Sequence, residues 1–159
     1  MKNRKLFAII TLVAFMLTMM PLMAFATSAS NSSISVDKSS AKVNNNLEFI
    51  LDLDAAVGAE QQVVVFAERS GSLSDADTIS VKDNKVTVTK GTNYGFIAFK
   101  NGTAKDEYTL LVNSATAGTV TLKAYVVSTT EEITDANVAK FYNGDNTIIK
   151  TALVGNGCT

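Results

Sequence analysis

Carboxylates are the side chains of this sequence with the clearest potential for chemistry. Asp52 and Asp54 lie at the end of an apolar segment, and Asp75 and Asp77 lie in a polar loop further along. Because Ca²⁺ prefers carboxylate oxygens, these residues are weak candidates for a calcium site at one end of the fold. Their spacing matches no calcium-binding loop, and solvated turns explain them equally well. We therefore expect no metal and no cofactor.

Other routes to catalysis have little support. The sequence contains no histidine, which excludes Ser-His-Asp and Cys-His catalysis and zinc or copper held by histidine. Glu48 and Glu68 could act as acid and base, but outward-facing charges on strands are normal, and a glycosidase needs a shaped cleft. Lys42 or Lys123 could instead form an isopeptide crosslink with an asparagine. We predict that the chain is not an enzyme.

The sequence has a single cysteine, Cys158. No disulfide can therefore form within the chain. An odd thiol in an exported protein favours an intermolecular disulfide, and a free cysteine in the tail is the alternative.

Residues 1–26 have the layout of a secretory signal peptide. A basic start is followed by an apolar stretch from Leu6 to Met23, and the segment ends in Ala24-Phe25-Ala26. The apolar stretch could remain as an uncleaved anchor, but Pro21 and the small-residue ending favour cleavage before Thr27. We expect a secreted chain, extracellular or at the cell surface, with no membrane span after cleavage.

The charge of the processed chain indicates which partners to expect. Cleavage would remove three of the 14 basic residues and no acidic one, leaving 11 basic against 15 acidic side chains. Binding to nucleic acid or to anionic lipid depends on a positive patch that releases counterions. The charge argues against both and favours other proteins, or further copies of this chain, as partners.

Alternating apolar and polar residues predict strands throughout residues 34–127. Alternate residues from Leu47 to Leu53 place four apolar side chains on one face, and residues 120–126 repeat the pattern. The segment 61–68 is β-branched and apolar, which is typical of a strand at the centre of a sheet. This spacing predicts an all-β, immunoglobulin-like β-sandwich of about seven to nine antiparallel strands with a C-terminal tail.

Two short polar turns are predicted, and the first of them is expected to close a β-hairpin. One is formed by residues 82–84, between strands at 78–81 and 85–89, and the other contains Asn101-Gly102, a pair that tolerates positive φ. Five aromatic side chains either fill the core or form a binding face: Tyr94, Phe96, Phe99, Tyr108 and Tyr125.

Both ends of the predicted sandwich carry additional segments. A flexible leader, residues 27–33, precedes it, and a C-terminal tail, residues 128–159, follows with a possible additional strand. Residues 131–142 of the tail fit either a helix or an extended chain. The tail either folds back on its own domain or, with the first strand, completes the sheet of a neighbour. The candidates for strand addition are Ile34, Val36, Ile148, Ile149 and Leu153.

The segment from Ser114 to Ala124 reads S-x-x-A-G-T-V-T-L-x-A. Together with the order of apolar strands before it, this segment resembles the bacterial immunoglobulin-like domains of invasin and intimin type adhesins, over Ile34 to Val127. In that family the small Ala-Gly pair makes the tight turn before the last strand. The resemblance implies a stalk or display module at a cell surface and no particular ligand.

These patterns predict a secreted cell-surface or extracellular-matrix module with a structural or adhesive role, which acts through protein–protein interaction. One alternative is a self-polymerising subunit of an extracellular filament, assembled by strand addition through its terminal arms. A second alternative is a small secreted ligand-binding protein or hydrolase.

Overall fold

The structure of the chain, a computed structural model, describes residues 32–38, 40–142, 144 and 147–157. The predicted signal peptide (1–26), most of the predicted leader (27–33) and Cys158 lie outside these residues. Among the described helices, none has the length and apolar character that a membrane span requires.

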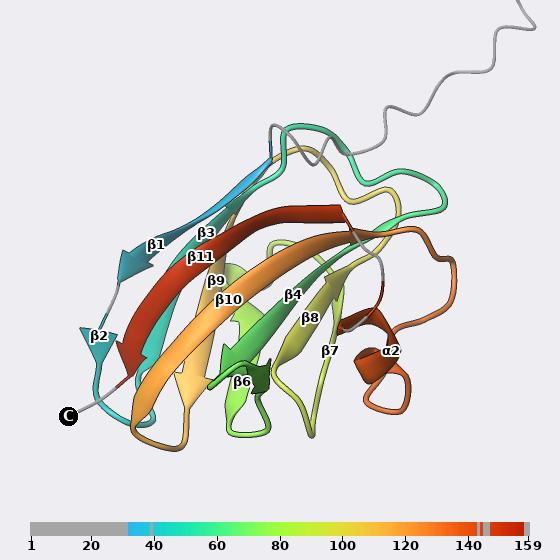
Figure 1. The fold of residues 1–159 in the computed structure, drawn as a ribbon. Helices are drawn as coiled ribbons and strands as arrows, with labels where there is room; N and C mark the ends of the chain where they lie inside the picture. Colours follow the sequence, from blue (N-terminus) through green and yellow to red (C-terminus); the bar gives the residue numbers. More distant parts are fainter. Residues whose placement is uncertain (1–31, 39, 143, 145–146, 158–159) are drawn as a thin grey trace, which may run out of the picture.

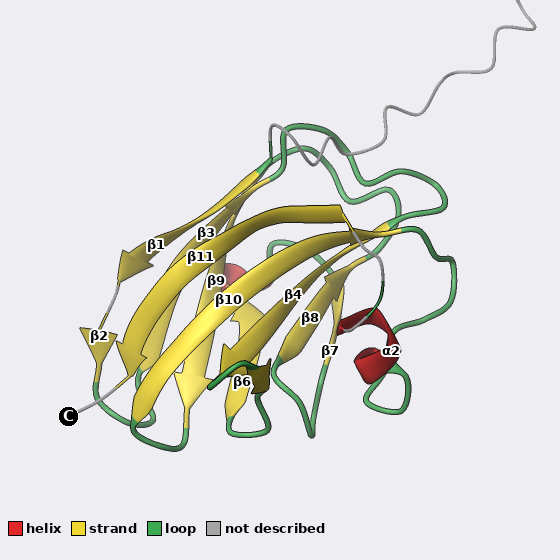
Figure 2. Cartoon of the chain, in the orientation of Figure 1, coloured by secondary structure: helices red, strands yellow, loops and turns green. Residues whose placement is uncertain are grey.

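Two β-sheets are stacked on each other (Figures 1 and 2). Sheet A has the strand order β1-β3-β9-β6, and sheet B has the order β2-β11-β10-β4-β8-β7, with β5 beside β4. All pairs are antiparallel except β11 with β2. Sheet A contains β1 (Ser33–Lys38), β3 (Asn46–Asp52), β9 (Glu107–Ser114) and β6 (Asp77–Val81). Sheet B contains β2 (Ser40–Ala41), β11 (Thr147–Gly157), β10 (Gly118–Val127), β4 (Gln62–Arg69), β8 (Phe96–Phe99), β7 (Val88–Lys90) and β5 (Ser72–Leu73).

The order of neighbouring strands is that of an immunoglobulin-like sandwich. In sheet A, β1, β3, β9 and β6 take the positions of strands A, B, E and D, and in sheet B, β11, β10 and β4 take those of G, F and C. A hairpin of β7 and β8 extends sheet B beyond the C position, and in the chain it lies between β6 and β9. The predicted all-β, immunoglobulin-like sandwich is confirmed.

The main core lies between the two sheets. Leu47, Phe49 and Leu51 point inward from β3, and Leu110 and Val112 point inward from β9. All five are at most 1% exposed, because alternate side chains of a strand lie on the same face. Full burial of each such side chain contributes about 1.5–3 kcal/mol. The predicted alternation of residues 47–53 is therefore confirmed.

A second core lies on the outward face of sheet B. There Val64 and Phe66 of β4 are covered by residues 128–142, which we call the strap and which contain the short helix α2 (Val138–Tyr142). Ile133, Val138 and Phe141 of the strap are buried against them. β4 lies between β10 and β8 in the sheet. One face of its apolar run contacts the main core and the other contacts the strap, so both faces are buried. The prediction that this segment is a central strand is confirmed.

The predicted hairpin around residues 82–84 is wrong. β6 pairs with β9 in sheet A, whereas β7 pairs with β8 in sheet B, so the 3₁₀ turn at Lys82–Asn84 and the residues after it carry the chain from one layer to the other. The predicted turn at Asn101-Gly102 is confirmed: Gly102 has φ of 77°, and the N–H of Thr103 donates to the carbonyl of Lys100 at 3.1 Å. This turn joins β8 of sheet B to β9 of sheet A. Alternation of apolar and polar residues predicts which side chains of a strand are buried. It does not predict the sheet to which the strand belongs, because strands of both sheets point their apolar side chains into the same core.

Candidate functional site

The four calcium candidates do not form a common site. Asp77 is buried, whereas Asp75 and Asp52 are exposed. Asp54 accepts a hydrogen bond of 2.7 Å from the Ser32 hydroxyl. Within the described part of the chain, no group of three or more His, Cys, Asp or Glu side chains could hold a metal ion.

Asp77 is the centre of a buried polar cluster. The Arg69 guanidinium donates to both carboxylate oxygens, from Nε at 2.7 Å and from Nη2 at 3.0 Å. The hydroxyl of Ser74 donates to the same carboxylate at 2.5 Å, and the hydroxyl of Ser114 donates to Oδ1. Arg69 also donates to the carbonyls of residues 116–117. The cluster therefore connects β4, β6, β9 and the turn between β9 and β10.

This cluster gives a physical role to the S-x-x-A-G segment. Ser114 begins the segment and binds Asp77, and the carbonyl of Ala117 accepts a hydrogen bond from Arg69. Gly118 has φ of 129°, and a Cβ atom at this position would lie 3.0 Å from Nη1 of Arg69. The positive φ favours glycine at this position, and the nearby guanidinium leaves little room for a side chain.

The ionisation of Asp77 stabilises the fold at neutral pH. Burial alone would raise the pKa of Asp77, but the hydrogen bonds from Arg69, Ser114 and Ser74 outweigh burial, and the pKa lies below its ordinary value of 3.8. Because the folded pKa is lowered, this contribution is present above pH 3.8 and is lost as the pH falls through the folded pKa.

A second polar cluster fastens the strap to sheet B. Glu68 of β4 lies 2.6 Å from Nζ of Lys123 and accepts a hydrogen bond of 2.5 Å from the Tyr142 hydroxyl. Burial and the neighbouring carboxylate raise the pKa of Tyr142. Burial would raise the pKa of Glu68, but its bonds with Lys123 and Tyr142 lower it overall. The end of α2 is thus held by a charge-assisted hydrogen bond.

We expect the Tyr142→Phe variant to lose about 1 kcal/mol of unfolding free energy, because Glu68 loses a hydrogen-bond donor while the aromatic packing stays. Urea denaturation at pH 7 measures this loss. Tyr94→Phe is the matched control, since Tyr94 is 38% exposed, and its effect should stay within about 0.5 kcal/mol. Equal stability of Tyr142→Phe and the wild type would show that this bond does not hold the strap.

Asp135 anchors the middle of the strap. Its carboxylate accepts hydrogen bonds from the Thr92 hydroxyl at 2.5 Å and from the backbone N–H groups of Thr92, Asn93 and Tyr94 at 3.0, 3.2 and 3.3 Å. These bonds, led by that of the Thr92 hydroxyl, lower the pKa of Asp135. The strap is therefore tied to the loop between β7 and β8 as well as to β4.

The proposed acid–base carboxylates, Glu48 and Glu68, are not brought together. Glu48 lies on the outward face of sheet A, 3.3 Å from Nζ of Lys82, whereas Glu68 lies on the outward face of sheet B beside the strap. The two carboxylates are on opposite sides of the sandwich because their strands belong to different sheets. Lys123 is bound to Glu68, and Lys42 is exposed.

The strand-addition candidates lie in strands that pair within the chain. Ile34 and Val36 belong to β1 and lie opposite Leu51 and Phe49 of β3. β11 pairs with β10 along its length, and β2 adds a short parallel contact at the end of β11. Ile148, Ile149 and Leu153 are part of β11.

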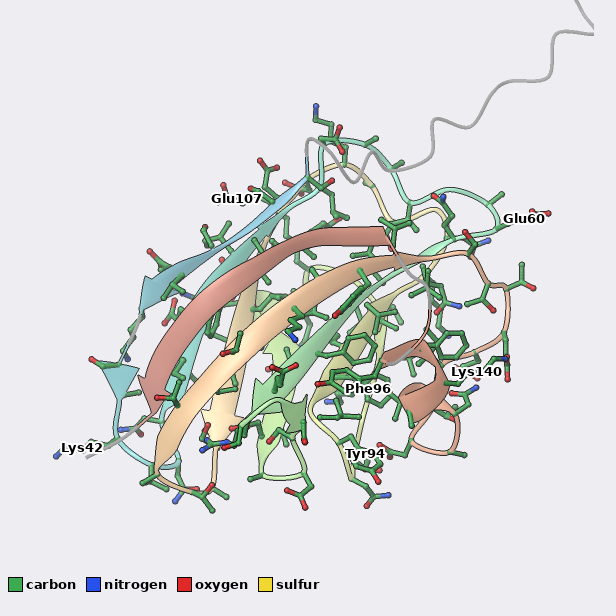
Figure 3. All side chains as sticks on the ribbon, in the orientation of Figure 1. Lys42, Glu60, Tyr94, Phe96, Glu107 and Lys140 are labelled. Carbon is green, nitrogen blue, oxygen red and sulfur yellow. The ribbon has the colours of Figure 1, made fainter. Side chains whose placement is uncertain are left out.

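Four of the five aromatic candidates fill the two cores. Phe99 and Tyr108 pack in the main core with ring centroids 5.2 Å apart. Phe96 and Tyr125 belong to the second core. Tyr94 is exposed, and Figure 3 shows it at the edge of the molecule.

The outward face of sheet A carries a feature that sequence reasoning missed. Ile50 of β3 lies opposite Thr109, and Leu111 of β9 lies opposite Glu48, so the two aliphatic side chains are diagonal neighbours. Every outward residue of β3 and β9 is half-buried or exposed. The sequence did contain an indication of this patch. Ile50 is apolar, yet it falls on the same face of its strand as Glu48 and Asp52.

The sequence matches no protein-family model and no curated protein. A solved structure similar to this one is that of WR4, a C. elegans MSP family member, with 11% sequence identity and a TM-score of 0.31. The match covers 78% of this chain and 97% of that chain. The fold assignment rests on the two sheets themselves, and the resemblance to adhesin domains stays a prediction.

Proposed function

We propose that this chain is an exported module with a structural or adhesive role, which acts at the cell surface or in the extracellular matrix by contact with other proteins and performs no catalysis. The observation that carries the proposal is the outward face of sheet A, which we call the Ile50 face. It consists of the outward side chains of β1, β3, β9 and β6 around Ile50 and Leu111.

The Ile50 face has the composition of a protein–protein contact. Ile50 lies between Ser35 and Thr109 in the register of the sheet, and Leu111 lies between Glu48 and Ser80. Protein interfaces commonly have an apolar centre and a polar rim. A face with two aliphatic side chains among hydroxyl groups follows this arrangement.

Charge at one end of the face indicates the chemistry of the partner. Asp52 and Glu107 lie directly opposite each other on β3 and β9, and both are exposed. Like charges opposed across a strand pair destabilise a sheet slightly. A partner with lysine or arginine at this position would relieve the repulsion and gain affinity, so we propose a partner surface with basic groups at one rim.

The Leu111→Asp variant tests the proposal in cells that export the chain. We expect the wild type to be cut before Thr27 and to be retained on the outside of the cells, where added protease reaches it. Leu111→Asp should lower the retained fraction at least tenfold, because it places a charge at the apolar centre of the face. Mass spectrometry of the processed chain and quantitative blots of cell and medium fractions provide the measurement.

Ala136→Asp is the matched control, since Ala136 is exposed on the strap, over the other sheet. It should be retained like the wild type. Retention that is equal for Leu111→Asp and the wild type, or a chain that stays inside the cell with residues 1–26 attached, would contradict the proposal. Filaments of the purified chain in negative-stain images would favour the filament alternative.

A further inference from the structure

The two ends of the Ile50 face differ in charge. At one end, Asp52 of β3 lies opposite Glu107 of β9, and both residues are exposed. We call this pair the acidic end. Towards the other end, the bulge in β1 places Lys38 opposite Glu48, and Lys38 is exposed. Glu48 is already paired with Lys82 at 3.3 Å, so it does not cancel the charge of Lys38.

Further donors lie beyond Lys38. Asn46 of β3 lies opposite Asn113 of β9, and Nδ2 of Asn113 donates to Oδ1 of Asn46 at 3.2 Å. This bond leaves the Nδ2 of Asn46 able to donate to another group. Lys42 lies in the turn before β3, and Figure 3 shows it at the opposite end of the molecule from Glu107. We call Lys38, Lys42, Asn46 and Asn113 the basic end.

The other charges near the acidic end balance in sign. Lys85 pairs with Asp106 at 2.6 Å. Lys105 and Asp54 line the same hollow in the loops beyond the strands. The acidic end therefore keeps the net negative charge of its two carboxylates, while the basic end offers ammonium and amide donors that suit carboxylates.

The centre of the face is apolar and has no cover within the described part of the chain. Ile50 and Leu111 lie between the two ends and are half-buried. The outward face of sheet B, in contrast, is covered by the strap. A partner of the Ile50 face must therefore bring an apolar centre, basic groups at one end and acidic groups at the other.

The face itself meets this description. Two copies related by a two-fold axis can stack face to face in two ways. If the axis runs along the strands, the acidic ends of the two copies lie over each other and repel. If the axis runs across the strands, the strands of the second copy are reversed. Each acidic end then lies over a basic end, and the aliphatic side chains of both copies meet at the centre.

We propose that the partner of the Ile50 face is a second copy of this chain, stacked in the reversed arrangement. The inference rests on the proposed function, because it uses the same face and names its partner. It gives the module a homotypic contact, through which copies on one surface or on facing surfaces hold each other.

The size of the face sets the expected affinity. Strand spacings of about 3.4 Å per residue and about 4.8 Å between strands make it about 20 Å long and about 14 Å wide. Such a face is smaller than the area of about 800 Å² that each partner contributes to a standard interface. We therefore expect a dissociation constant of about 0.1 mM. Copies concentrated at a surface pair at this affinity because their effective concentration is high.

Sedimentation equilibrium of the chain from Thr27 onward tests the self-association. The Cys158→Ser background removes disulfide dimers, and concentrations from about 10 µM to about 1 mM bracket the expected constant. Leu111→Asp should weaken the dimer at least tenfold, whereas Ala136→Asp, on the strap, should associate like the wild type. Raising the salt to about 1 M should also weaken the dimer, because it screens the charges at both ends. A monomer at every concentration, or equal association of Leu111→Asp and the wild type, would overturn the inference.

Disulfide trapping tests the arrangement without relying on a disruptive variant. Glu107→Cys and Asn113→Cys are made separately in the Cys158→Ser background. In the reversed stacking, residue 107 of one copy lies over residue 113 of the other, so the mixture should form disulfide dimers faster than either variant alone. Faster trapping of Glu107→Cys with itself would place acidic end over acidic end and contradict the proposal.

The inference and the proposed function fail in distinguishable ways. A chain that stays monomeric in solution but is retained on cells through Leu111 would remove the second copy as partner and keep the proposed function. A chain that forms the reversed dimer, but whose retention is unchanged by Leu111→Asp, would keep the dimer and remove the proposed role in retention.

Discussion

The Asp77→Ala variant is expected to lose about 3–5 kcal/mol of unfolding free energy. The substitution removes the two carboxylate oxygens to which the Arg69 guanidinium donates, and the Arg69 side chain is only 17% exposed. It also removes the acceptor of the Ser74 and Ser114 hydroxyls. Breaking a buried ion pair by deleting one partner is costly because the other charge stays buried without its counterion.

Urea denaturation at pH 7 measures the loss, and Asp75→Ala is the control. Asp75 is exposed in the same loop, so its removal should change stability by less than about 0.5 kcal/mol. The difference between the wild type and Asp77→Ala should shrink as the pH falls below 3.8, because the wild-type carboxylate then becomes protonated. A difference that stays constant down to pH 2 would contradict the pairing with Arg69.

The Phe66→Ala variant is expected to lose about 3–5 kcal/mol. Phe66 is fully buried beneath the strap. Its ring packs edge to face against Tyr125 and Tyr142, with centroids 5.6 and 5.5 Å away. Removing the ring leaves a cavity between β4 and α2. The bonds of Asp135 and Tyr142 limit how far the strap can move to fill it.

Hydrogen exchange distinguishes a local loosening of the strap from a loss of stability across the whole fold. Backbone amides of α2 should exchange faster in Phe66→Ala than the global change predicts, whereas those of β3 and β9 should follow the global change. Tyr94→Ala removes an exposed aromatic side chain and should leave both stability and exchange near wild-type values. If amide exchange became faster by the same factor in all strands and in α2, the second core would unfold only together with the main core.

Inward and outward positions were predictable along single strands, because the side-chain period of a strand is independent of its partners. Leu47 to Leu53 illustrates this, and the continuous apolar run of β4 indicated a central strand. The layer of each strand was not predictable. Residues 78–81 and 85–89 alternate equally well, and only contact with β9 or β8 decides their sheets.

The polar clusters were the least predictable part. Asp77 was a calcium candidate by its type, but Arg69, which determines its role, comes from the neighbouring sheet. Such sites depend on contacts between segments that are distant in sequence, and local sequence patterns do not predict these contacts.

The parallel pairing of β2 with β11 has a mechanical consequence. Gly157 lies beside Ala41, whereas β1 begins at the other end of the sandwich, as Figure 1 shows. A force that pulls the start of β1 away from the end of β11 therefore acts along the strands, and the hydrogen bonds of the terminal strands are loaded in shear. Bonds loaded in this direction break together rather than one after another, so this geometry resists stretching.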